Sequence, residues 1–203
     1  MVEQELVEAY FESNGFLVRQ AGGSSVGDAR RKLDPLPVLA VMNPRADQNN
    51  LHSETRLFSA DLNRIRAAVV GVLGWSNSPF SPAVMSSDSR QLKFLKQQLD
   101  KERVEDCLNP GPQLAESGMG SFLRLLVVPA LPLQGEKMKE AIALIESLGV
   151  DGVLTLRSIL ENLLRQALPG QGREGRWMFQ ILRLIKAYGL ARDPQIEIFN
   201  TSD

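Results

Sequence analysis

Five short apolar runs recur along this chain, and three of them are almost free of polar residues. The three lie at Leu36–Met42, Ala67–Leu73 and Leu125–Val128, the last within a predicted strand Leu123–Val128. Unbroken apolar runs of this length are typical of strands that are buried on both faces of a sheet. Phe16–Gln20 and Gly152–Leu156 predict two further strands, so the pattern indicates a sheet of at least five strands.

Between the strands, apolar residues recur every three or four positions, as they do on the buried face of an amphipathic helix. The first helix is expected to end at Asn14-Gly15, because both residues tolerate the left-handed conformation of a helix cap. Ser86–Ser89 and Ser158 offer side-chain oxygens that cap the starts of two later helices. The predicted helices are Val2–Ser13, a charged helix from Ser86–Ser89 to about Val104, Glu136–Leu148, one that begins at Ser158, and Trp177–Tyr188, while Ile196–Phe199 is a candidate terminal edge strand.

The order of these elements predicts an α/β protein with a mixed central sheet sandwiched by helices. Strand–helix alternation from Leu123 onward implies parallel strands joined by right-handed crossovers. The three earlier strands imply antiparallel pairing, and the polar stretch Arg45–Ser59 is expected to be an exposed loop. We expect a single domain over residues 1–203, with a core of about 2–156 and a C-terminal helical extension of about 157–203.

Composition narrows the class of protein further. The chain has 203 residues, 43% of them apolar, which suffices for a sizeable core, and a formal net charge of −1. A nearly neutral chain has no overall attraction to nucleic acid or to anionic lipid. No apolar stretch reaches the roughly 20 residues that span a bilayer, and the acidic N-terminus does not read as a signal peptide. Cys107 is the only cysteine, which excludes an internal disulfide, so we expect a cytoplasmic protein.

The predicted order resembles that of the PD-(D/E)XK nuclease superfamily, the restriction-endonuclease-like fold. The core of that fold is a helix, a three-strand meander, a crossover helix and a further strand. Val2–Gln20 is similar to its opening, a helix with an acidic residue, here Glu5 or Glu8, followed by the first strand. The resemblance covers about residues 2–156 and implies that Leu36–Met42 would bring in a catalytic aspartate and Ala67–Leu73 a Glu-x-Lys pair.

The residues at those positions are not the residues that the chemistry needs. In the family, carboxylates hold magnesium ions that stabilise charge on the attacked phosphate, and the lysine orients the attacking water. Here the Glu-x-Lys positions hold Gly71-Val72-Leu73, and the aspartate position falls near Pro37 or Val38. None of these side chains can bind a metal or move a proton. We therefore expect a degenerate member without catalytic residues, metal or cofactor.

The alternative to a degenerate member is an active nuclease whose metal-binding acids lie at other positions. Asp28 and Asp34 flank Arg30-Arg31-Lys32 and could serve as shifted metal ligands in an active, metal-dependent nuclease. The plainer interpretation is that they are solvated loop acids. By the same reasoning, Asp61 is expected to be a helix N-cap, and Glu5 and Glu8 are expected to face solvent.

The other residues that could take part in catalysis or ligand binding have no obvious partners near them in the sequence. His52 is the only histidine and lies in a polar stretch, so an exposed loop residue is favoured over a catalytic base. Cys107 has no adjacent basic residue, which favours an inert thiol. The chain contains no P-loop, dinucleotide fingerprint or Gly-x-Ser-x-Gly elbow. Trp75, just after a predicted strand, is expected to pack over the sheet edge rather than to line a ligand cleft.

Two basic groups are candidates for contact with nucleic acid. In the C-terminal helix, one face carries the basic residues and the other carries Trp177, Ile181, Leu184 and Tyr188, which we expect to be core. The basic face is therefore expected to be solvated, whether or not it binds phosphates. The candidate residues are Arg30, Arg31, Lys32 and Arg45 in the first group and Arg176, Arg183 and Lys186 in the second.

These observations favour a non-catalytic, nuclease-like domain that acts as a binding or scaffold module. Its partner is expected to be nucleic acid or protein, and a homodimer fits this class of fold. Two alternatives remain: an active metal-dependent nuclease that uses Asp28 and Asp34, and a protein-interaction domain unrelated to nucleic acids. No membrane partner is expected.

Overall fold

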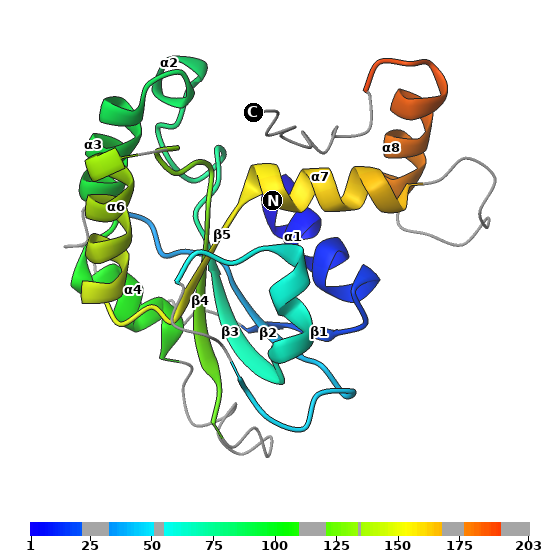
Figure 1. Cartoon of the computed structure of the whole chain (residues 1–203), viewed down its shortest axis with the longest axis horizontal. Coiled ribbons are helices and arrows are strands. Elements are labelled where there is room, and N and C mark those ends of the chain that lie inside the picture. The colour runs from blue at the N-terminus through cyan, green and yellow to red at the C-terminus, as the bar shows by residue number, and fades with distance from the viewer. Residues whose placement is uncertain (22–32, 51–54, 110–120, 134, 168–176, 192–203) are drawn as a thin grey trace, which may run out of the picture.

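A five-stranded mixed sheet forms the centre of the protein (Figure 1). The computed structural model describes residues 1–21, 33–50, 55–109, 121–133, 135–167 and 177–191. The strands follow the order of the chain, with β1 to β3 antiparallel and β3 to β5 parallel. This arrangement confirms the predicted α/β class and the mixed sheet. The strands are β1 Leu17–Ala21, β2 Val38–Met42, β3 Ala67–Val72, β4 Leu123–Val128 and β5 Gly152–Thr155.

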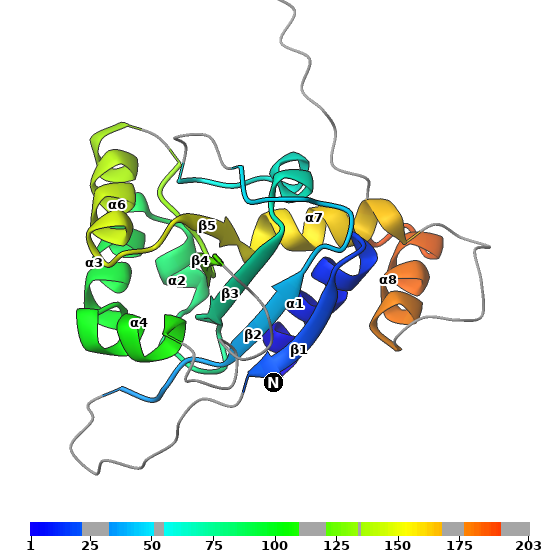
Figure 2. The ribbon, with the colours of Figure 1, turned by 90° about the horizontal axis from the view of Figure 1, so that it is seen from below.

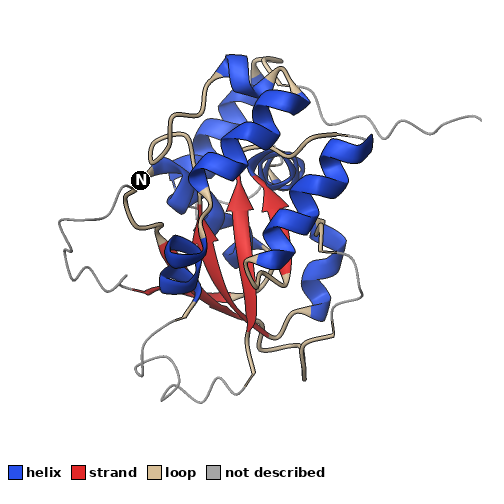
Figure 3. Cartoon of the chain, turned by 90° about the vertical axis from the view of Figure 1, so that its left-hand side faces the viewer, coloured by secondary structure: helices blue, strands red, loops and turns tan. Residues whose placement is uncertain are grey.

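Helices cover both faces of the sheet (Figure 3). The side chains of β3 alternate between two apolar layers, with Val70 and Val72 in one and Val69 in the other. The whole of β3 is buried, which explains why its sequence is an unbroken apolar run. The first layer is covered by α1 Val2–Ser13, η1 Ser59–Arg64, α7 Leu156–Gln166 and α8 Trp177–Ala187. The second layer is covered by α3 Asp88–Gln98, α4 Lys101–Leu108 and α6 Gly135–Ser147. The short helix α2 Pro82–Met85 precedes α3.

Helix ends follow the local chemistry of the sequence, with three corrections. The chain leaves α1 through Asn14 and through Gly15, whose φ of +88° is the expected left-handed conformation. The single charged helix predicted up to Val104 is wrong, because Asp100 caps a new helix by accepting a hydrogen bond from the Arg103 amide at 2.7 Å. Thr155 caps α7 instead of Ser158.

Asp61 is likewise not an N-cap. It is the third residue of η1, and its carboxylate accepts a hydrogen bond from the Phe58 amide at 2.9 Å. The acid therefore still serves a backbone donor at the start of the helical turn, from a position inside it.

The two edges of the sheet differ. Residues 55–57 run along β5, where the Leu57 amide donates to Val153 O at 2.9 Å and the Val153 amide donates to Thr55 O at 2.7 Å. Thr55 and Leu57 are buried, so this part of the expected exposed loop Arg45–Ser59 is a covering segment instead. The β1 edge carries exposed side chains.

The C-terminal helices belong to the same apolar core as α1. Ile159 and Leu163 of α7, together with Met178 and Leu182 of α8, join the layer that contains Val7 and Phe11. None of the described helices is long and apolar enough to cross a lipid bilayer. The candidate terminal strand Ile196–Phe199 lies outside the described residues.

Gly152 allows the covering segment to approach β5, and this contact gives a test. A Cβ at position 152 would lie 2.5 Å from Leu57 Cδ1 and 2.9 Å from Leu125 Cδ2. We expect Gly152→Ala to lower the free energy of unfolding by about 1–3 kcal/mol, as overpacked cores do. Urea denaturation measures this loss. Combining it with Leu57→Ala should cost less than the two single losses added together; strict additivity would contradict the contact.

Candidate functional site

The nuclease resemblance implies catalytic acids on β2 and β3, at a point where these two strands pair. Val38 stands opposite Gly71 in the antiparallel register, so the sequence alignment does bring the two positions together. Val38 and Leu73 are buried in the second apolar layer with Leu36 and Leu126. A Cβ on Gly71 would lie 2.7 Å from Cys107 Sγ, so α4 occupies the volume that a longer side chain needs.

This place does not suit a metal ion. Apolar atoms surround Val38, Gly71 and Leu73, whereas Mg²⁺ requires oxygen ligands. Among the described residues, no group of three or more His, Cys, Asp or Glu side chains is placed to hold a metal. Asp34 is exposed at the approach to β2, and Asp28 lies outside the described residues.

Arg103 and Cys107 lie one turn apart on α4, beside this position. The Arg103 guanidinium is buried and donates from Nε to Asp34 O at 2.8 Å and from Nη1 to Gln98 O at 2.7 Å. Burial lowers the pKa of Arg103, and Asp100, Cys107 and Asp34 oppose that shift. The guanidinium therefore ties the approach to β2 to the α3–α4 junction.

The Cys107 thiol is buried beside Gly71 of β3. Burial raises its pKa to about 12, although Arg103 acts in the other direction. The sequence expectation of an unreactive thiol agrees with this, but its reason was incomplete. A basic residue does stand one helical turn away, and burial outweighs its effect.

A carboxylate that the sequence analysis missed holds the carboxyl end of β3. Glu3 of α1 is buried, and its Oε1 accepts hydrogen bonds from the Trp75 amide at 2.9 Å and the Ser76 amide at 3.0 Å. Its Oε2 accepts from Ser76 Oγ at 2.6 Å. Gly74 is needed here, because a Cβ would lie 2.8 Å from Glu3 Cγ. Both oxygens of Glu3 thus bind the turn, which makes it a structural lock between α1 and β3.

Glu3 has a shifted pKa for the same reason. Burial acts to raise the pKa, but the hydrogen bonds from Ser76, from the Trp75 amide and from the backbone of Glu3 itself outweigh it and lower the pKa below 4.5. Trp75 packs edge-to-face on Phe80, with ring centroids 4.9 Å apart, and Phe80 packs on Phe94 at 5.0 Å. These contacts agree with the expected packing role of Trp75.

The two acids that the resemblance singled out on α1 are not plain solvent-facing charges. Glu8 is buried and accepts a hydrogen bond from Gln20 Nε2 at 2.6 Å, which joins α1 to β1. Glu5 is half-buried and accepts from Trp177 Nε1 at 3.1 Å. The expectation that both face solvent is therefore wrong.

The basic face of α8 is turned inward. Arg183 and Lys186 are half-buried, and Lys186 Nζ donates to Leu164 O at 3.1 Å, near the C-terminal end of α7. A cation at this end of a helix is favourable, because the unpaired carbonyls carry partial negative charge. The expected solvated basic face is thus wrong, and so is the expected core face. Trp177, Ile181, Leu184 and Tyr188, hereafter the α8 stripe, are exposed.

The remaining basic candidates are not assembled into one surface by the described residues. Arg45 is exposed, with its Nη1 near Gly15. Five other candidates of the sequence analysis lie outside the described residues: Arg30, Arg31, Lys32, His52 and Arg176.

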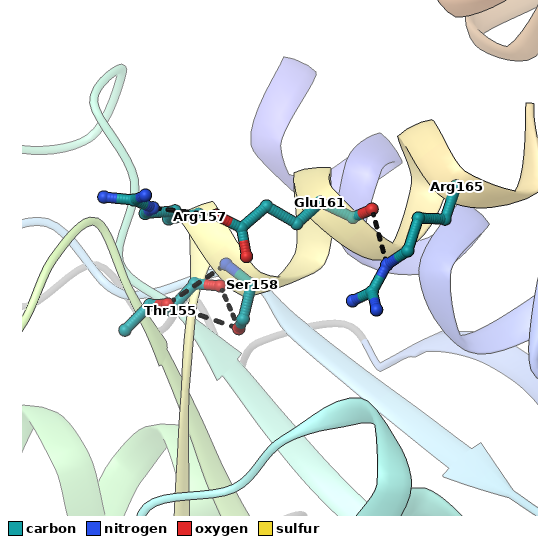
Figure 4. Close-up of polar contacts among 5 residues, drawn as sticks. All are labelled: Thr155, Arg157, Ser158, Glu161 and Arg165. Carbon is teal, nitrogen blue, oxygen red and sulfur yellow. Dashed lines mark hydrogen bonds and ion pairs between the residues drawn. The ribbon is translucent and has the colours of Figure 1, made fainter. Parts of the chain in front are cut away.

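The outer side of α7 carries a short series of polar contacts (Figure 4). The Ser158 amide donates to Thr155 Oγ1 at 3.2 Å, and Ser158 Oγ donates to Thr155 O at 2.8 Å. Arg157 Nε pairs with Glu161 Oε1 at 2.8 Å, and Arg165 Nε donates to Glu161 O at 3.3 Å. The two hydroxyl groups contact each other as well, since Thr155 Oγ1 donates to Ser158 Oγ at 3.2 Å. These contacts stabilise the start of α7.

Comparison with known proteins adds no relative: no family model, curated protein or solved structure matches this chain.

The Glu3 lock predicts a pH-dependent effect on stability. Glu3→Gln removes an acceptor for Ser76 Oγ, and we expect it to lower the free energy of unfolding at pH 7 by about 1–3 kcal/mol. Because the folded-state pKa of Glu3 is lowered, its stabilisation is present above pH 4.5 and is lost as the pH falls through the folded-state pKa. Urea titrations of both proteins between pH 7 and pH 3 should therefore converge on the acid side. A constant difference would contradict the lock.

Lys186 predicts a smaller effect, on helix docking. Lys186→Met keeps the aliphatic stem and removes the donor to Leu164 O, so we expect a loss of about 0.5–1 kcal/mol in the free energy of unfolding. Lys186→Arg restores a cationic donor and should retain most of the stability, as measured by urea denaturation. Equal stability of the methionine variant and the native protein would show that the contact does not hold α8.

Proposed function

We propose that this chain is a non-catalytic, nuclease-like domain that serves as a binding module, and that its partner is a protein. The order of elements supports the nuclease-like part of this proposal. A helix, a three-strand meander, crossover helices and a parallel fourth strand follow one another as the resemblance implies. A fold alone does not assign an activity, so the rest of the proposal depends on particular side chains.

The packing around Gly71 supports the loss of catalysis. Restoring a glutamate there would place its Cβ 2.7 Å from Cys107 Sγ, before the rest of the side chain is considered. Restoring a lysine at Leu73 would bury a charge in an apolar layer, which is costly without a partner. The position is therefore filled as part of the core, and α4 would have to move before metal ligands fit.

The orientation of α8 carries the protein-binding part of the proposal. The helix directs Lys186 to the end of α7, and it leaves four large apolar side chains in solvent. Exposed apolar stripes of this kind mark interaction surfaces, whereas nucleic acid is bound chiefly through exposed basic groups. The half-buried Arg183 and Lys186 are poorly placed for phosphate contacts.

A cleavage assay tests the loss of catalysis. We expect no conversion of supercoiled plasmid and no shortening of single-stranded DNA with Mg²⁺ or Mn²⁺, because no carboxylates meet at Val38 and Gly71 among the described residues. Asp34→Ala should be indistinguishable from the native protein in the same gel assay. An active nuclease of the family serves as the positive control.

Two outcomes would overturn the proposal. Metal-dependent cleavage that disappears in Asp34→Ala would restore the displaced-acid nuclease. Tight DNA binding that weakens steeply with salt and with Arg45→Glu would replace the protein partner with nucleic acid.

A further inference from the structure

Helix α8 lies at the outer edge of the molecule (Figure 2), and the α8 stripe is a regular row of large, exposed apolar residues along it. Its four residues follow one another at steps of four, three and four, which is the spacing of one seam of a helix pair. Trp177 is 53% exposed, Ile181 44%, Leu184 56% and Tyr188 78%.

The stripe is held in place before any partner arrives. Met178 and Leu182 of α8 are buried in the core, and Lys186 is bonded to Leu164 O. Trp177 Nε1 donates to Glu5 Oε2 at 3.1 Å, which fixes the indole at one end of the row. A surface that is ordered in advance loses less conformational entropy when it binds.

The size of the stripe suits a reversible contact. An aromatic side chain buries roughly 150–250 Å², so the exposed parts of Trp177 and Tyr188 together amount to on the order of 250 Å². Ile181 and Leu184 bring the stripe into the range of about 300–600 Å² that marks functional patches. Interfaces that bury less than about 1,200 Å² in total belong to weak, concentration-dependent complexes.

A second copy of α8 matches this stripe in an antiparallel arrangement. With a two-fold axis between Ile181 and Leu184, Ile181 lies opposite Leu184 of the second copy, and Trp177 lies opposite Tyr188 of the second copy. Aliphatic residues then meet aliphatic residues and aromatic residues meet aromatic residues, as a two-fold interface requires of a self-complementary patch.

Within α8, the positions that flank the stripe carry no charged side chain. The flanking positions hold Met178, Gln180, Ile185 and Ala187, none of which is charged. In paired helices, charges at these positions select the partner and its orientation. At these positions of α8, a charged partner would find no opposite charge, and a second copy of α8 would meet no like charge.

From these observations we infer that the α8 stripe is a homodimer interface, in which two copies of α8 pack antiparallel. This inference rests on the proposed function as a protein-binding module and names the partner. The residues after α8 match the stripe less well, because Ile196 and Ile198 alternate as in a strand while the stripe repeats every three or four residues.

Sedimentation velocity of the full chain tests the inference. We expect a monomer–dimer equilibrium between micromolar and submillimolar concentration. Leu184→Glu brings a carboxylate to an apolar contact twice per dimer, and it should weaken the dimer at least about tenfold. Leu133→Glu is the matched control, because Leu133 is 64% exposed outside α8, and this variant should dimerise as the native chain does. Circular dichroism checks that each variant is folded.

A charge exchange tests the antiparallel register. Ile181→Lys alone should weaken the dimer as Leu184→Glu does. In the double variant, each introduced lysine lies opposite the introduced glutamate of the second copy, so dimerisation should return to within about threefold of the native value. In a parallel pair the like charges would meet instead, and a double variant that stays monomeric overturns the register.

Other occupants of the stripe give distinct results, and each overturns the inference. A native chain that stays monomeric at every concentration excludes the second copy. A monomer that dimerises only after Ile196, Ile198 and Phe199 are changed to serine assigns the stripe to the chain's own tail. Stripe-dependent flotation with phosphatidylcholine–phosphatidylserine vesicles assigns it to a membrane. The cleavage assay is read independently of dimerisation, so a failure of the non-catalytic proposal can be told apart from a failure of the homodimer inference.

Discussion

Complete burial of β3 is the constraint on which the rest of this structure depends. Every residue of the strand is buried; Ala68, Val70 and Val72 lie in one apolar layer, Val69 lies in the other, and Gly71 lies against α4. A strand in that position cannot carry a charged group without a partner, because the loss of hydration is not compensated. The same packing that makes the sheet stable therefore fills the space beside Gly71 with apolar side chains and the Cys107 thiol.

Polar groups gather where the buried strand ends. Glu3 binds the turn after β3, Arg103 binds the backbone at the approach to β2, and Glu8 joins α1 to β1. Each of these groups is satisfied mainly by backbone or side-chain partners within the fold, as buried polar groups generally are. Their role is to fix how the covering helices meet the sheet.

Much of the fold could be predicted from the sequence, and the errors share a cause. Short apolar runs placed the strands and period-3.6 patterns placed the main helices, because burial of both faces of a strand or of one face of a helix leaves a direct trace in the sequence. The orientation of α8 could not be predicted in this way. Its two faces both contain large apolar residues, and the choice between them was decided by Lys186 at the end of α7 and by Met178 and Leu182 in the core.

The candidate site, like the fold, could be predicted from the sequence only in part. The sequence could mark Gly71-Val72-Leu73 and the vicinity of Pro37 and Val38 as the positions to inspect, and only the structure shows that Val38 pairs with Gly71. The role of Glu3 could not be predicted, because its partners Trp75 and Ser76 are far from it in sequence. A glutamate in the first turn of a helix is also common and by itself indicates no such role. Its only local signal was the turn-forming Gly74-Trp75-Ser76-Asn77, which showed a tight turn but not its partner.

The covering segment at residues 55–57 has a consequence for how the chain is synthesised. Arg56 pairs with Val153, so an early part of the chain completes the sheet beside its last described strand. During synthesis Leu57 leaves the ribosome before β5 has been made, so its amide cannot yet donate to Val153 O. Contacts between residues so distant in sequence form slowly, because a long loop has to close first. The sheet is therefore finished only after β5 has left the ribosome, and until then the apolar residues of the segment remain open to chaperones and to unwanted pairing.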